Sequence, residues 1–157
     1  MKIKWKNLIT ALVIPLAVGG ISGFVTQKNM NVFKSLDKPP LTPPEWAFPV
    51  IWTILFVLMG ISTYIISVSD TEKSLKNSAY LNYAVQLAVN FFWTVIFFTF
   101  KKYLFAFIWL ILLLFWIIQM ILSFNKISKT SALIQLPYLI WTMFAGYINL
   151  DVYLLNR

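Results

Sequence analysis

The side chains that could do chemistry in this chain are few, and the most informative are amides. Gln86 and Asn90 are four residues apart, so they share one face of a helix, and Trp93 follows on roughly the same side. An amide without a partner is costly in apolar surroundings, so this face must look into a bundle. It fits either interhelical hydrogen bonding or a polar anchor in a ligand cavity.

The chain contains no Cys and no His. This excludes disulfides, thiol nucleophiles, histidine acid–base chemistry and the usual zinc sites, and it removes the commonest axial ligands of haem. No metal site and no obligatory cofactor are predicted. The only charge inside an expected helix is Asp151, near its end, which counts against an ion-coupled carrier.

Aromatic residues make up 18% of the chain, with 7 Trp, 7 Tyr and 14 Phe. Five tryptophans lie deep within apolar stretches, at Trp52, Trp93, Trp109, Trp116 and Trp141. Each fits packing in a core or against lipid. Several around one cavity would form flat walls for a flat apolar ligand. Beside a photosensitising ligand, such readily oxidised side chains would donate electrons.

Five windows of 21 to 24 residues carry no Asp, Glu, Lys or Arg: 7–27, 46–69, 77–100, 103–125 and 130–150. A membrane-spanning helix needs about 20 apolar residues. The sequence therefore predicts an all-α integral membrane bundle of five transmembrane helices, at about 8–27, 46–68, 79–100, 103–124 and 131–155. We expect one domain over residues 1–157, multi-pass in the cell membrane.

The formal net charge of +8 comes mainly from lysines in short connections. It fits membrane topology and attraction to the anionic lipid bilayer, and no soluble basic module for nucleic acid is present. The longest connection, 28–45, contains Lys38-Pro-Pro-Leu-Thr-Pro-Pro44. Four prolines cannot lie inside a helix, so we expect a stiff, extended lid or rim at the membrane surface.

Four segments of the chain resemble the TspO/MBR family, whose members are also called translocator proteins, peripheral benzodiazepine receptors or tryptophan-rich sensory proteins. They are Lys38-Pro-x-x-x-Pro-Pro44, Val50-x-Trp52-x-x-Leu55 with Met59-Gly60, Gln86-Leu-x-x-Asn90-x-x-Trp93 with Phe97-Phe98, and Pro137-Tyr-Leu-x-Trp141-x-x-Phe144-Ala145 with Asn149. The resemblance is to bacterial members.

The resemblance implies a ligand pocket under the first loop. In it, Trp52 and Asn90 would donate hydrogen bonds to a ligand carbonyl or carboxylate. The wall would be formed by Trp141, Ala145, Phe56 and Trp93, and the lid by Phe33 and Pro44. Family members bind tetrapyrroles such as protoporphyrin IX, isoquinoline carboxamides and benzodiazepines, and they tend to be homodimers.

The chain departs from the family pattern at three places. Leu41 stands where the family usually has Trp, and Val32-Phe33 stands where it has Trp-Tyr. The missing hydroxyl at Phe33 removes one candidate ligand contact or oxidisable donor. Leu150-Asp151 also alters the stretch that contacts sterol in the family.

Three functions follow as hypotheses. The first is a membrane receptor or sensor that binds tetrapyrroles or another flat apolar small molecule, with porphyrin as ligand rather than cofactor. The second is enzymatic, namely light-dependent porphyrin degradation in which Trp52 and Trp141 are the catalytic electron donors. The third is facilitated transport of porphyrin, haem or a lipid such as sterol.

Overall fold

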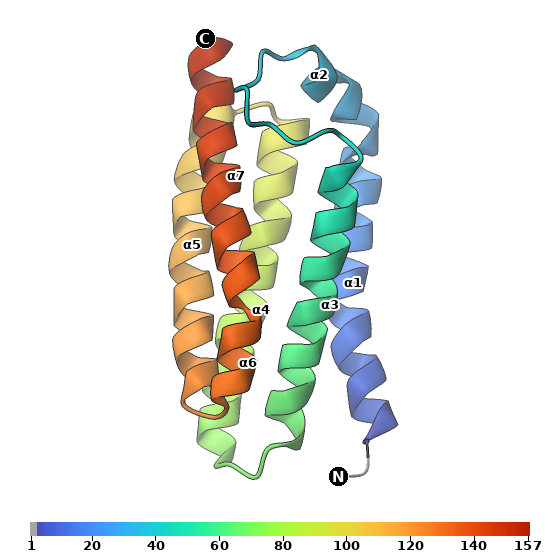
Figure 1. The fold of residues 1–157 in the computed structure, drawn as a ribbon, viewed down its shortest axis with the longest axis vertical. Coiled ribbons are helices and arrows are strands. Elements are labelled where there is room, and N and C mark those ends of the chain that lie inside the picture. The colour runs from blue at the N-terminus through green and yellow to red at the C-terminus, as the bar shows by residue number, and fades with distance from the viewer. Residues whose placement is uncertain (1–2) are drawn as a thin grey trace.

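A computed structural model of the chain describes residues 3–157, which form an all-α bundle. Five stretches of helix within these residues are long and apolar enough to cross a membrane (Figure 1). They consist of α1 (Trp5–Thr26) with the 3₁₀ turn η1 (Gln27–Asn29) and α2 (Met30–Ser35), α3 (Ala47–Val68), α4 (Lys73–Thr94) with the π-helical turn η2 (Val95–Thr99), α5 (Tyr103–Asn125), and α6 (Lys129–Ile134) with α7 (Leu136–Leu155).

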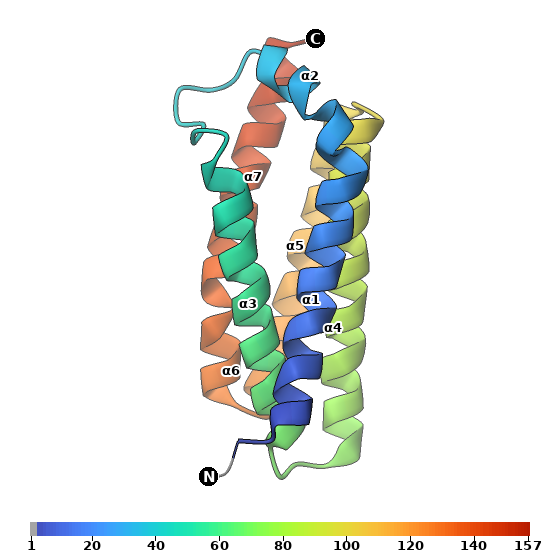
Figure 2. The same cartoon turned by 90° about the vertical axis from the view of Figure 1, so that its right-hand side faces the viewer.

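The helices are arranged in a ring that differs from their order along the chain. Helix α1 packs against α3 and α4, α4 packs against α5, and α5 packs against α6 and α7. Helix α3 closes the ring by packing closely on α6 rather than on α7 (Figures 1 and 2). Helices α3 and α6 are therefore in contact at one end, whereas a cavity lies between α3 and α7 at the other end.

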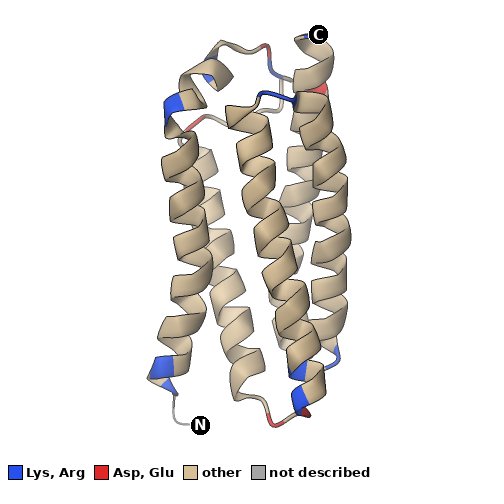
Figure 3. Cartoon of the chain, turned by 180° about the vertical axis from the view of Figure 1, so that it is seen from behind, with Lys and Arg blue, Asp and Glu red and all other residues tan. Residues whose placement is uncertain are grey.

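Charged residues gather at the two ends of the bundle, and the middle of each long helix carries none (Figure 3). The described N-terminal end of the chain and its C-terminus lie at opposite ends, as an odd number of spans requires (Figure 1). Large apolar side chains such as Phe24, Ile108 and Ile140 are exposed on the outer surface. Such a surface suits lipid rather than water, so this is a multi-pass membrane protein.

Three helices differ from the sequence-based prediction beyond small shifts of their ends. Helix α4 begins at Lys73 rather than at 79, because a helix can extend with charged residues beyond the hydrocarbon layer. The segment 28–45, predicted as extended, begins with η1 and α2 and becomes extended only from Leu36. The sequence permits this helix, because no Pro or Gly interrupts the chain between Gly23 and Pro39, and the packing of Phe33 on Phe97 and Phe98 stabilises it. The predicted helix 131–155 is likewise two helices that meet at Gln135, because Pro137 cannot donate to the carbonyl of Leu133.

Close contact between α1 and α3 depends on Gly60. A Cβ atom at this position would lie 2.9 Å from the carbonyl oxygen of Ala11 and 2.9 Å from the Cα of Leu12. Pro15 has no N–H to donate to the carbonyl of Ala11, so that oxygen lacks its helical partner and lies against the glycine instead. Only a residue without a side chain allows this approach.

Gly60→Ala is expected to lower the free energy of unfolding by about 1–3 kcal/mol, because backbone atoms of α1 must move away. The measurement is thermal unfolding of the purified protein in detergent. Gly20→Ala is the matched control, since no atom lies within 4 Å of a Cβ at Gly20. Equal melting temperatures for both variants would contradict this account of the α1–α3 contact.

Candidate functional site

A cavity of about 680 Å³ lies at the loop end of the bundle, between α1, α3, α4 and α7 and beneath α2. Its volume is within the range of about 300–1,000 Å³ that is usual for small-molecule sites. Helix α3 contributes one wall through Phe48, Trp52 and Phe56, and α7 contributes another through Trp141 and Ala145.

Aromatic rings form most of the cavity wall. The ring of Trp52 lies 6.2 Å from that of Trp93 and 5.7 Å from that of Phe56, at interplanar angles of 34° and 31°. On the α7 side, Trp141 makes an edge contact with Phe48, with ring centroids 6.0 Å apart. Indole and phenyl rings from two sides therefore line the same space, which suits a flat apolar ligand.

Asn90 links the cavity to a buried chain of polar groups. Its Nδ2 donates to the hydroxyl of Tyr138 at 2.8 Å, and that hydroxyl donates to Oε1 of Gln86 at 2.9 Å. Within residues 3–157, Oδ1 of Asn90 has no hydrogen-bond partner, although Asn90 lines the cavity. Asn90 was predicted to donate a hydrogen bond to a ligand. One N–H of its Nδ2 is already used by Tyr138, and its Oδ1 is available to the cavity as an acceptor.

Two of the cavity tryptophans differ in how their indole N–H groups are used. Nε1 of Trp93 donates to Oδ1 of Asn149 at 3.1 Å, and Nδ2 of Asn149 donates to the carbonyl of Tyr103 at 2.8 Å. This pair of bonds holds the Trp93 ring in place. Nε1 of Trp141 is buried and finds no acceptor within the described part of the chain. A buried N–H without an acceptor costs free energy. Trp141 therefore lines the cavity with its ring, while its N–H is turned away from the open space.

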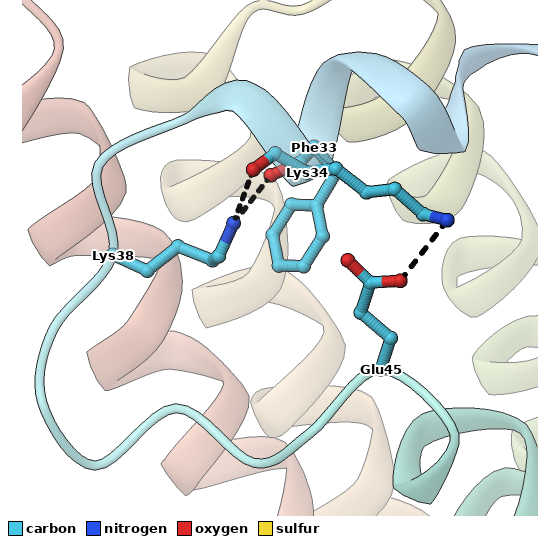
Figure 4. Close-up of polar contacts among 4 residues, drawn as sticks. All are labelled: Phe33, Lys34, Lys38 and Glu45. Atoms are coloured by element: carbon cyan, nitrogen blue, oxygen red, sulfur yellow. Dashed lines mark hydrogen bonds and ion pairs between the residues drawn. The ribbon is translucent and has the colours of Figure 1, made fainter.

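Phe33 closes the cavity from above. It is 5% exposed and packs on Phe48, Phe97 and Phe98, with centroid distances of 5.7 to 5.9 Å. Nζ of Lys38 lies 4.9 Å from the centre of the Phe33 ring. The same Nζ donates to the carbonyls of Phe33, Lys34 and Leu36, at 2.8, 3.0 and 3.2 Å, and so caps the end of α2. Figure 4 shows the first two of these contacts.

The extended part of the loop is tied to the end of α7. The backbone N–H of Asp37 donates to Oδ1 of Asn156 at 3.0 Å, and Nδ2 of Asn156 donates to the carbonyl of Asp37 at 2.8 Å. The loop therefore rests on both sides of the cavity, on α2 and on α7. This arrangement is a lid with fixed ends rather than a free tether.

The structure brings most of the predicted site residues to this one cavity. Those that line it are Phe33, Trp52, Phe56, Asn90, Trp93, Trp141 and Ala145. Pro44 is not part of the lining, and its carbonyl accepts a hydrogen bond from the N–H of Ala47 at the start of α3. The following residues, Glu45 and Trp46, line the cavity instead.

Other deep tryptophans have a packing role. Trp109 donates from Nε1 to the carbonyl of Val89 at 2.8 Å, and neither Trp109 nor Trp116 is among the described residues that line the cavity.

Two residues of the site were not predicted from the sequence, Phe48 in the cavity wall and Tyr138 behind Asn90. Helical spacing is the signal that could have found them, since Phe48 is four residues before Trp52 and Tyr138 is three before Trp141.

The fold and the cavity together define a multi-pass helical membrane protein with a lidded, aromatic-lined pocket. The sequence model of the TspO/MBR family matches residues 11–154 of the chain. The chain therefore belongs to the TspO/MBR family.

Similar proteins come from distant organisms. The tryptophan-rich protein TspO of Chlorobaculum tepidum is 34% identical over 142 residues, which is 90% of each chain. The tryptophan-rich sensory protein of Cereibacter sphaeroides is 32% identical over 79% of this chain and 76% of its own length. The translocator protein of Ovis aries is 30% identical over 92% of this chain and 87% of its own length.

Proposed function

We propose that this protein is a membrane receptor or sensor that binds tetrapyrroles of the protoporphyrin IX type in the cavity beneath α2. Isoquinoline and benzodiazepine-type molecules belong to the same class of flat apolar ligand. The observation that carries the proposal is the pair of aromatic walls on α3 and α7, which bound a cavity of about 680 Å³. Stacking on such walls needs no specific polar group and suits a planar macrocycle.

The polar residues of the cavity support a metal-free macrocycle. Oδ1 of Asn90 is a free acceptor for a hydrogen-bond donor of the ligand. The chain has no His and no Cys to bind the iron of haem. The residues present therefore match a porphyrin without iron better than ligated haem.

The test is a titration of the purified protein in detergent with protoporphyrin IX, in the dark, followed by quenching of tryptophan fluorescence. We expect saturable binding at micromolar concentration or below, because Trp52, Trp93 and Trp141 would all contact the ligand. Partitioning equal to that of empty detergent micelles would contradict the proposal.

A second function, light-dependent porphyrin degradation, is favoured by the contacts of Trp52. Its ring centroid lies 6.2 Å from that of Trp93 and 6.3 Å from that of Tyr138, so Trp52 is in contact with two other oxidisable rings. In this proposal, an excited porphyrin takes an electron from Trp52 or Trp141 and passes it to dissolved oxygen, which becomes superoxide. The superoxide adds to the porphyrin ring and opens it, and the tryptophan radical is restored by an electron from the ring adduct, so that oxygen is the net oxidant.

Illumination of the complex is expected to bleach the porphyrin absorbance faster than illumination of porphyrin in detergent alone. Trp141→Phe should slow this bleaching several-fold while porphyrin still binds, because phenylalanine is much harder to oxidise than tryptophan. Trp116→Phe is the control, since Trp116 lies outside the cavity lining. Equal bleaching rates with and without protein would remove the enzymatic proposal.

The homodimer and the location in the cell membrane belong to the same proposal. Both are supported by membership of the family and by the exposed apolar helix faces, which need lipid or a second copy to cover them.

A further inference from the structure

The cavity has charged side chains at its mouth only. Among the described residues that line it, Lys34 and Glu45 are the charged ones, and all others are apolar or neutral. Lys34 belongs to α2, and Glu45 lies two residues before the start of α3. Because both side chains are about half exposed, each stands on an edge where the cavity opens to the surface.

The two side chains form an ion pair across this opening. Nζ of Lys34 lies 3.2 Å from Oε2 of Glu45, and their side chains are 53% and 46% exposed, respectively. Figure 4 shows both side chains reaching toward each other past the ring of Phe33, which roofs the cavity. A half-exposed ion pair is weak because water and salt screen it, so it opens readily when another anion can replace Glu45.

The neighbouring Lys38 is unsuited to this exchange. Its ammonium group has three N–H donors, and the carbonyls of Phe33, Lys34 and Leu36 accept from it. Lys34 by contrast has an exposed carboxylate as its partner, which a second carboxylate can replace without loss of a hydrogen bond.

From this geometry we infer that Lys34 recognises a carboxylate of the ligand and that Glu45 occupies its place while the cavity is empty. The inference rests on the proposed function and narrows its ligand class. The preferred ligand has a flat apolar body, which lies between the aromatic walls, and an acid group on one edge, which lies at the mouth. A neutral ligand of the same shape gains nothing from Lys34.

The experiment compares protoporphyrin IX, a dicarboxylic acid, with its dimethyl ester, which has the same ring but no charge. Both are titrated in the dark into the full-length protein and into Lys34→Met, Glu45→Gln and Lys28→Met. Lys28→Met is the matched control, because Lys28 is a cation in η1, directly before α2, that does not line the cavity. All three side chains are exposed, so each variant should fold.

We expect Lys34→Met to weaken binding of the acid about fivefold and to leave binding of the ester unchanged. Glu45→Gln should strengthen binding of the acid about twofold to fivefold, because the competing carboxylate is gone. Lys28→Met should change neither ligand.

Equal affinities for acid and ester in every variant would overturn this inference and leave the proposed function in place. A loss in Lys28→Met as large as that in Lys34→Met would also overturn it, because general surface charge would then explain the preference. Saturable binding of neither ligand would overturn the proposed function, and this inference with it.

Discussion

Asn90→Leu is expected to weaken protoporphyrin IX binding by about tenfold or more, which corresponds to about 1.4 kcal/mol. Leucine has nearly the shape of asparagine but lacks Oδ1, the acceptor at the cavity wall without a partner in residues 3–157. A hydrogen-bond donor of the bound ligand at this wall would then be buried without an acceptor. The measurement is the dissociation constant from fluorescence quenching in the dark.

Asn90 also supports the fold, so a control must separate its two roles. Tyr138→Phe removes the same Asn90–Tyr138 hydrogen bond but acts behind the cavity, since Tyr138 is 1% exposed and does not line it. This variant should lower thermal stability and change affinity by less than about threefold. Equal losses of affinity in both variants would show that Asn90 acts by positioning its neighbours rather than by contacting the ligand.

Asn149→Leu is expected to lower the free energy of unfolding by about 2 kcal/mol, from two interhelical bonds of about 0.6–1.7 kcal/mol each. Asn149 is 1% exposed and joins Nε1 of Trp93 on α4 to the carbonyl of Tyr103 at the start of α5. Both partners would become buried groups without a hydrogen bond. Thermal unfolding in detergent should show a melting temperature lower by about 6 °C.

Asn7→Leu is the matched control for this variant. Asn7 is half-buried at the opposite end of the bundle, and its amide makes a single long contact of 3.4 Å with the hydroxyl of Ser67. Its replacement should shift the melting temperature by less than about 2 °C. An unchanged melting temperature in Asn149→Leu would mean that water or lipid replaces both of its bonds.

The fold class follows from the sequence because a lipid bilayer restricts the possible structures severely. Each charge-free window is long enough to cross the hydrocarbon layer, and a backbone in lipid must satisfy its hydrogen bonds within its own helix. The amides at Gln86 and Asn90 indicate the inner face of their helix, since lipid cannot bind them. The wall of the site was predicted through its tryptophans and the resemblance to the family.

The end of the first helix was harder to predict, because the connection that follows it is itself partly helical. The continuation of the first helix through α2 depends on the packing of Phe33 against Phe97 and Phe98, residues more than sixty positions away. The pairing of Lys34 with Glu45 in turn depends on where α2 lies above α3. Composition and local spacing contain no information about such contacts.

The sequence by itself determined the number of spans, the class of fold and the residue types that surround the site. The tertiary structure decided that α3 lies beside α6, that Trp52, Trp93 and Trp141 line one cavity while Trp109 packs on α4, and that Asn90 binds Tyr138. The physical reason is that lipid is as apolar as the protein core. Hydrophobicity therefore marks which segments enter the membrane, but only contacts between helices determine which face of each helix turns inward.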